Sequence, residues 1–357
     1  MKERLEIKNF GPVKNLNIEI KPLTLFIGTQ GSGKSTISKL IAIFRNQEWQ
    51  KHANEGQYLW KKSFIDFNID EYFQKDSYIS YQNDDVKIVY QNGKFSINSI
   101  LSKSTDSFHQ EETSMLYIPA ERNLVGNLSS ALASIILAKV PLSETIIEYM
   151  SLFEKAKKEF PRYEIPFLGV RYEKKEGKER IIVSEEGKDL PLNACSSGLQ
   201  SVLPMIMVID YALKNESFDS FVIEEPEQNL FPENQRELLN FICSKQNSEH
   251  FVQCIITTHS PYLLSCLNVL MLASKLHQDE SIKEEVEHTV TPTNMVKPSD
   301  VAVYGLYPNT EDEEYCKSLI SERTGLISVN ELDCVSEVIG EDFDRLYRLY
   351  MNTLKKK

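Results

Sequence analysis

Gly28-Thr-Gln-Gly-Ser-Gly33-Lys34-Ser35 is the stretch of this sequence that decides its fold. It matches the pattern G-x-x-x-x-G-K-[ST] in full. The continuous apolar run Leu23–Ile27 comes just before it and predicts a buried strand, while Ser35–Phe44 carries apolar residues at helical spacing. A glycine-rich loop between a strand and a helix is the setting in which this pattern binds phosphate groups. The sequence therefore predicts a P-loop in an α/β fold.

The chemistry of this loop points to a nucleoside triphosphate. Its glycines let backbone N–H groups close around phosphate oxygens, and the following helix adds partial positive charge at its N-terminus. Lys34 supplies a charge for the β- and γ-phosphates, and the Ser35 hydroxyl is a ligand for Mg²⁺. We therefore expect ATP and Mg²⁺ as cofactors; the alternative is a chance glycine turn. The residues expected to bind ATP belong to the loop and the first helical turn: Gly28, Thr29, Gln30, Gly31, Ser32, Gly33, Lys34, Ser35 and Thr36.

A second apolar run, Phe221–Ile223, leads directly into two acids. In P-loop enzymes such a strand end holds the metal with one carboxylate and activates the attacking water with the other. We assign Glu224 to Mg²⁺, together with Ser35, and Glu225 to the general base. A solvated acidic strand end is the alternative.

A histidine follows the next predicted strand, Val252–Thr257. His259 comes 34 residues after Glu225, in the setting Thr257-Thr-His-Ser-Pro261. Open α/β sheets place ligand contacts at the carboxyl ends of their strands, and an imidazole there can hydrogen-bond a γ-phosphate oxygen. The expected catalytic residues are therefore Glu225, His259 and Lys34, although a lone histidine is often just a packed or surface residue.

The segment Asn193-Ala-Cys-Ser-Ser-Gly-Leu-Gln200 looks like the signature segment of ABC ATPases. With the other motifs in this order, the sequence resembles ABC-type ATPases of the RecF/SMC/overcoming-lysogenisation branch. The resemblance implies a P-loop NTPase with an ABC-ATPase head: a mixed central sheet, an antiparallel β subdomain and a helical signature subdomain. It also implies that Ser196, Ser197 and Gly198 of one copy act in trans on the γ-phosphate held by another copy. Ser-Ser-Gly is otherwise an ordinary helix N-cap.

Two further stretches refine the resemblance. Glu224–Pro232 looks like the soluble genome-maintenance and defence branch and not like a transporter. Only about 190 residues separate Lys34 from Glu224, without a heptad run, so there is no room for a long coiled-coil arm. Leu116–Asn123 is similar to strings in ATPases of bacterial anti-phage systems, and there we expect Arg122 either to reach a phosphate or a partner, or to pair with Glu121.

The chain is expected to divide near residue 270. We predict an ABC-type ATPase domain over 1–270, with an antiparallel β insertion at 58–114 and a helical and signature subdomain at 124–200. Residues 271–357 are predicted to form an α+β extension, with a hairpin from Val301–Tyr307 to Tyr315–Ile320. Thr324–Cys334 and a Phe343–Tyr350 helix look like the C-terminal segment of defence ATPases.

Composition limits the partners. The formal charge of -12 disfavours polyanion binding over the whole surface, and the six cysteines show no metal-ligand spacing. No apolar run approaches the roughly 18–20 residues of a membrane span, and the start lacks a signal-peptide pattern. We expect a cytoplasmic protein without a membrane partner.

The leading hypothesis is an ATPase that dimerises, or forms a higher homo-oligomer, around ATP as the sensor or switch subunit of an anti-phage system. By resemblance to Septu, retron-associated and PARIS-like ATPases, a separately encoded nuclease or toxin would be its effector, since no nuclease pattern follows residue 270. A RecF-like clamp that binds nucleic acid is the alternative, and a scaffold with structural ATP is a third. The clamp would need a basic groove, for which the candidates are Lys155, Lys157, Lys158, Lys174, Lys175, Lys178, Arg180 and Lys355–Lys357.

Overall fold

A mixed six-stranded sheet forms the centre of the molecule, with strand order β15-β14-β3-β13-β12-β7. The computed structural model describes residues 3–46, 49–50, 57–100, 115–128, 134, 137–138, 142–175, 177–183, 187, 189–247, 250–308, 314–328 and 340–348. The strands of the central sheet are β3 (Leu23–Gly28), β7 (Met115–Ile118), β12 (Ser220–Glu224), β13 (Gln253–Thr258), β14 (Val301–Leu306) and β15 (Cys316–Ser318). All neighbours are parallel except β15, which is antiparallel to β14. The predicted α/β fold with a mixed central sheet is confirmed.

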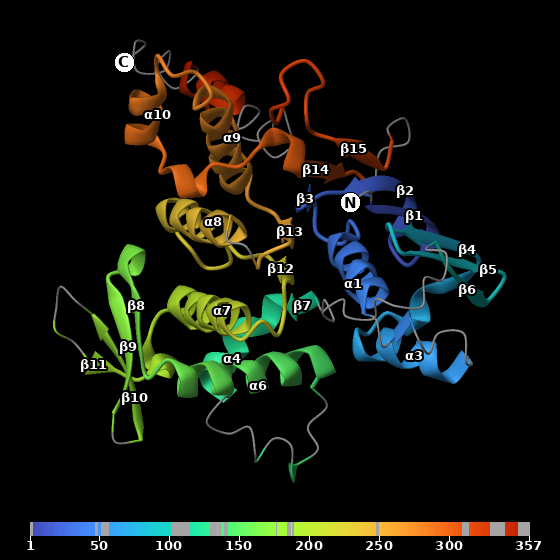
Figure 1. The fold of residues 1–357 in the computed structure, drawn as a ribbon, viewed down its shortest axis with the longest axis horizontal. Helices are drawn as coiled ribbons and strands as arrows, with labels where there is room; N and C mark the ends of the chain where they lie inside the picture. Colours follow the sequence, from blue (N-terminus) through green and yellow to red (C-terminus); the bar gives the residue numbers. More distant parts are fainter. Residues whose placement is uncertain are drawn as a thin grey trace, which may run out of the picture.

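The central sheet is apolar on both faces and separates two cores. Along β12, Phe221 and Ile223 pack into one core while Val222 packs into the other, as the alternation of a strand requires. Helix α1 (Lys34–Arg45) covers one face (Figure 1). The helices on the other face are α6 (Glu144–Glu159), α7 (Ser197–Lys214), α8 (Pro232–Gln246) and α9 (Pro261–Leu276). Burial on both faces explains why these strands read as continuous apolar runs.

A five-stranded antiparallel sheet packs beyond α1, with order β2-β1-β4-β5-β6. Its strands are β1 (Glu3–Phe10), β2 (Val13–Ile20), β4 (Phe73–Gln82), β5 (Val86–Gln91) and β6 (Lys94–Ser99), and α3 (Gln57–Asp66) packs beside it. The antiparallel β structure predicted within 58–114 is present in β4, β5 and β6. They form one sheet because β4 pairs with β1, which local patterns do not indicate. Residues 101–114 of the predicted insertion lie outside the described residues.

A buried polar cluster ties this antiparallel sheet to the central sheet. The Glu3 carboxylate is 1% exposed and accepts hydrogen bonds from the Arg45 guanidinium at 3.0 Å, the Tyr81 hydroxyl at 2.6 Å and the Gln253 amide at 2.8 Å. The Arg45 guanidinium also reaches the Ser220 hydroxyl at 3.0 Å. Such burial of charge is tolerated because both ions are hydrogen-bonded. The far end of α1 is thereby fixed to both sheets.

A separate four-stranded antiparallel sheet, β11-β10-β9-β8, lies beyond α6 and α7 (Figure 1). Its strands are β8 (Arg162–Ile165), β9 (Val170–Lys175), β10 (Lys178–Val183) and β11 (Asp189–Leu190). Strands β9 and β10 form a hairpin around the turn at Gly177. Within the predicted helical and signature subdomain, α6, α7 and α4 (Asn123–Leu128) are helices, whereas residues 129–133, 135–136 and 139–141 lie outside the described residues.

The C-terminal residues extend the central sheet. The predicted hairpin is confirmed by the pairing of β14 with β15, and β14 also pairs in parallel with β3. The predicted extension therefore shares the sheet of the ATPase domain, and its boundary at residue 270 remains a prediction. After α10 (Lys283–Thr289), the last described helix covers residues 340–348, whereas residues 329–339 and 349–357 lie outside the described residues. No helix found in the described ranges is long and apolar enough to cross a bilayer.

Candidate functional site

The predicted motifs meet at one edge of the central sheet. Because β3, β7, β12 and β13 run parallel, their carboxyl ends lie side by side. The P-loop follows β3, Glu224 ends β12 with Glu225 next to it, and His259 follows β13. Residues from three distant parts of the sequence are thus brought to one place.

The P-loop wraps around the Lys34 side chain. Gly31 and Gly33 have φ angles of +75° and +95°, which a side chain would strain. The Lys34 ammonium donates hydrogen bonds to the carbonyls of Gly28 at 2.9 Å and Thr29 at 3.0 Å. Burial lowers the pKa of Lys34 to about 8, against the opposing charge of Glu225. The cation is therefore close to the acid pair and is the positive centre of the site.

Glu225 and His259 form a contact at the mouth of the site. The Nε2 atom of His259 lies 3.3 Å from Oε1 of Glu225, and both side chains are about one-third exposed. The hydrogen bond from His259 lowers the pKa of Glu225, so the carboxylate is charged at neutral pH. Glu225 has a φ of +43°, a conformation that costs a non-glycine residue about 1–3 kcal/mol. Its N–H donates to the Thr257 carbonyl at 2.8 Å, which holds this turn against β13.

The residues assigned to the metal fit a hard cation. The Glu224 side chain is 5% exposed, and its Oε1 atom makes no hydrogen bond with the described residues. Its Oε2 atom accepts only a long bond of 3.3 Å from the Ala120 N–H. Ser35 is exposed in the first turn of α1. A buried carboxylate and an exposed serine at a phosphate loop offer oxygen ligands of the kind that Mg²⁺ prefers.

Glu227 belongs to the site and was missed from the sequence. Its Oε1 atom accepts hydrogen bonds from the Thr258 hydroxyl at 2.6 Å and the His259 N–H at 2.9 Å. Burial raises the pKa of this carboxyl. The contact joins the turn after Glu225 to the turn that carries the histidine. The sequence feature that could have identified Glu227 is its place as a third acidic residue two positions after Glu225.

Arg122 occupies a position that neither expectation described. Its side chain is fully buried, and its guanidinium donates to the carbonyls of Pro119, Glu224 and Glu225. It therefore does not extend toward solvent for a phosphate or a partner, and no ion pair joins it to Glu121 within the described residues. Instead, the guanidinium binds the backbone of both acids of the pair.

The signature segment lies at the start of α7. Both interpretations, an ABC signature segment and an ordinary helix N-cap, predicted a helix start here. The Ser196 hydroxyl accepts from the Leu199 N–H at 3.4 Å and caps α7. Ser196 and Ser197 are exposed, whereas Gly198 is buried. A Cβ atom on Gly198 would lie 2.6 Å from the Asn229 carbonyl, so only glycine fits against the turn after Glu225. Gly198 therefore packs against the turn that follows Glu225, while Ser196, two residues earlier, lies exposed on the surface.

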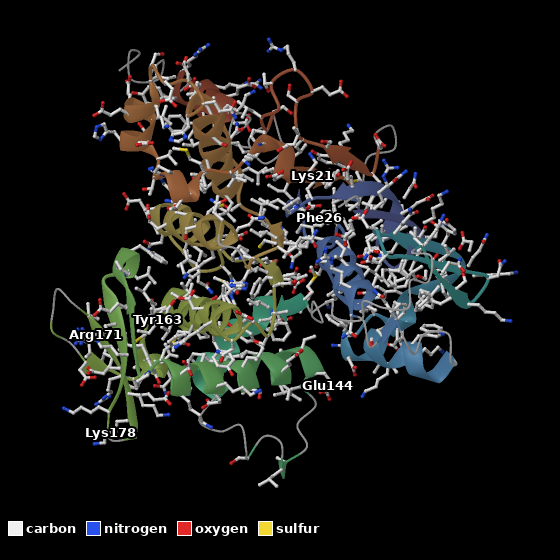
Figure 2. The ribbon with its side chains drawn as sticks, in the orientation of Figure 1. Lys21, Phe26, Glu144, Tyr163, Arg171 and Lys178 are labelled. Atoms are coloured by element: carbon white, nitrogen blue, oxygen red, sulfur yellow. The ribbon has the colours of Figure 1, made fainter. Side chains whose placement is uncertain are left out.

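Three of the candidate basic residues form ion pairs with neighbouring acids. Lys157 pairs with Glu154 at 2.7 Å and with Glu179 at 3.0 Å, and Arg180 pairs with Asp189 at 3.2 Å. Lys174 also contacts Glu179, at 3.5 Å. Figure 2 places Arg171 and Lys178 on this outer sheet, well away from Phe26 of β3. These pairs favour a solvated charged face; Lys355–Lys357 lie outside the described residues.

Comparisons with known proteins match this chain to an ATPase domain family. A family model described as an AAA ATPase domain matches residues 1–164 and 142–264. The OLD nuclease of Thermus scotoductus is 22% identical over 323 residues, covering 73% of this chain. The chain spans 59% of the length of that curated relative.

Solved structures that align with this chain include heads of SMC proteins. An SMC head bound to the C-winged helix domain of ScpA aligns with a TM-score of 0.47 at 14% identity, covering 90% of this chain and 98% of that one. The SMC head domain from Thermotoga maritima aligns with a TM-score of 0.38 at 14% identity, covering 74% and 91%.

Proposed function

Because the chain belongs to the AAA ATPase domain family, we propose that it binds ATP at the P-loop and hydrolyses it with Glu225 as general base. The observation that carries the proposal is the contact of Glu225 with His259, at 3.3 Å, beside the buried Lys34. A charged carboxylate, an imidazole and a cation at the carboxyl edge of a parallel sheet are the groups that phosphoryl transfer needs.

Each residue has a distinct task in this mechanism. Loop N–H groups and the Lys34 ammonium hold the β- and γ-phosphates. Glu225 takes a proton from water as the oxygen attacks the γ-phosphorus, and the bond to the bridging oxygen breaks to give ADP and phosphate. His259 holds the Glu225 carboxylate through their 3.3 Å contact and would stabilise charge that develops on the γ-phosphate oxygens. When bound at Ser35 and Glu224, Mg²⁺ neutralises charge on the phosphate oxygens.

We further propose that ATP joins two copies of the chain. The exposed Ser196 and Ser197 at the N-terminus of α7 offer a hydroxyl and helix N–H groups to an anion. In a dimer, they would meet the γ-phosphate held by the P-loop of the other copy. Loss of that phosphate would remove the shared contact and release the partner, which is a two-state switch.

The mass of the protein in solution tests this assembly. With ATP and Mg²⁺, the Glu225→Gln variant is expected to shift to a dimer or larger species, because it retains the γ-phosphate that both copies share. Light scattering during gel filtration measures it. Ser196→Arg in the same background is the control and should stay at the mass without nucleotide; equal masses in all samples would contradict the shared site.

The ATP state would serve as the switch of a cytoplasmic anti-phage system with a separately encoded nuclease or toxin. The support is the family membership together with the similarity to the OLD nuclease over 59% of its length. Affinity capture with the ATP-bound Glu225→Gln variant, expressed with its neighbouring genes, tests this role. An effector retained by that variant and lost on adding Ser196→Arg is the expected result. The paired basic residues give the RecF-like clamp no comparable support.

ATP affinity is expected to fall at alkaline pH. Since burial lowers the pKa of Lys34 to about 8, its ammonium is charged below that pH and neutral above it. The Kd for ATP should be flat from about pH 7 to 7.5 and then rise above pH 8, approaching ten-fold per pH unit. Calorimetric titration across this range measures it. Lys34→Arg cannot lose its proton there, so its Kd, although weaker, should not change with pH; an equal rise in both proteins would assign the effect to another group.

A further inference from the structure

We propose that Tyr315 is a positioning residue for the P-loop, so that nucleotide affinity depends on the β14–β15 hairpin. The inference rests on the proposed function, because it concerns the same nucleotide site. It gives the C-terminal residues a role at this site, which the motifs do not. Tyr315 precedes β15 and is 7% exposed.

The contact between Tyr315 and the loop is direct. Its hydroxyl donates a hydrogen bond to the Ser32 carbonyl at 2.5 Å. The Ser32 side chain is itself fully buried, and its residue is separated from Tyr315 by 283 positions in the sequence. On the other side, the Tyr307 N–H donates to the Tyr315 carbonyl at 2.8 Å, which fixes the tyrosine within the hairpin. The hairpin therefore holds one carbonyl of the phosphate loop.

Holding that carbonyl also sets the direction of an N–H group. In a planar trans peptide, the C=O of one residue and the N–H of the next point in opposite directions. A donor on the Ser32 carbonyl consequently turns the Gly33 N–H away from the tyrosine. N–H groups of this loop are the ones that hold phosphate oxygens in P-loop proteins. Tyr315 thus orients a donor for the nucleotide without touching the nucleotide.

The β14–β15 hairpin and the residue before β15 pack directly against the P-loop. A Cβ atom on Gly33 would lie 2.6 Å from the Tyr315 hydroxyl and 2.9 Å from Val13. A Cβ atom on Gly28 would lie 2.6 Å from the Leu306 carbonyl of β14. Two glycines of the motif are therefore required by the hairpin as well as by the loop. A shift of the hairpin would have to move the loop with it.

The same hairpin offers a matched control. The Tyr304 hydroxyl donates to the Glu19 carbonyl at 2.7 Å, an exposed contact of the same chemical kind, and accepts from the Glu19 N–H at 3.1 Å. Glu19 lies on β2 and not on the P-loop. Replacing either tyrosine by phenylalanine removes one hydroxyl and its bond to a main-chain carbonyl, and Tyr304→Phe also removes the bond accepted from the Glu19 N–H. Only the Tyr315→Phe change removes a bond to the phosphate loop.

The experiment measures nucleotide affinity, turnover and unfolding for wild type, Tyr315→Phe and Tyr304→Phe. Tyr315→Phe is expected to weaken both ADP and ATP by about three- to ten-fold, since one net hydrogen bond is lost and both nucleotides carry the β-phosphate. Its kcat at saturating ATP should stay within about two-fold, because Glu225 and His259 are unchanged. Tyr304→Phe should bind like wild type, and the two variants should melt at similar temperatures without nucleotide.

The outcomes separate this inference from the proposed function. Equal ADP and ATP affinities in wild type and Tyr315→Phe would overturn the role of Tyr315 alone. Equal losses of affinity in both variants would also overturn it, because they would reflect general loosening of the hairpin. If wild type bound neither nucleotide, the proposed function itself would fail.

Discussion

Replacing Glu225 by glutamine is expected to lower kcat for ATP hydrolysis by about 10²–10⁴-fold while ATP still binds. Glutamine has nearly the same shape as glutamate but cannot accept the proton of the attacking water. The hydrogen bond from His259 keeps the carboxylate charged at neutral pH, so the wild type has its base ready. Phosphate release measures kcat, and a nucleotide titration measures binding. Because Lys34 and the loop are unchanged, KM should change far less than kcat.

Glu216→Gln is a matched control for this prediction. Glu216 also has a positive φ, of +50°, and its Oε1 atom lies 3.8 Å from Nε2 of His250. Both side chains of this second pair are exposed; Glu216 lies between α7 and β12, and His250 lies between α8 and β13. The control should hydrolyse ATP like wild type. Normal turnover by Glu225→Gln would remove Glu225 as the base and leave the contact with His259 as a structural one.

Replacing Arg122 by methionine is expected to lower both stability and kcat, the latter by at least about 100-fold. The guanidinium binds the carbonyls of Pro119, Glu224 and Glu225 in a fully buried position. Methionine leaves these carbonyls without donors, at roughly 1–3 kcal/mol for each buried unpaired group. Since the Glu225 backbone is strained at its φ of +43°, the turn should relax and displace the carboxylate. Chemical unfolding and phosphate release measure the two effects.

Arg122→Lys separates positioning from folding. Lysine keeps the charge but replaces the planar fork of donors by a single ammonium, so it cannot bind two neighbouring carbonyls in the same geometry. The expected result is a folded protein with nearly unchanged KM for ATP and a kcat lowered about ten-fold or more. Wild-type kcat in a well-folded Arg122→Lys protein would contradict a positioning role. Because this variant keeps the buried cation, the prediction remains testable even if Arg122→Met does not fold.

Local sequence patterns were sufficient for the parts of the site that lie on single elements. The P-loop, the acid pair and His259 each follow a buried strand, and such strands show as apolar runs whatever they pair with. The hairpins were also visible, because turn residues separate β-prone segments within a short distance. Helix α9 was not predicted from the sequence.

The sequence by itself determined the α/β class, the nucleotide loop and the order of the motifs, because these depend on neighbours in the chain. Only the tertiary structure decided that β14 lies beside β3, that Arg122 binds the backbone of the acid pair 102 residues away, and that Tyr315 binds Ser32. The last two contacts end on main-chain carbonyls. Every residue has such a carbonyl, so no residue type marks the partner, and the pairing is fixed only when the parallel strands bring distant segments to one edge.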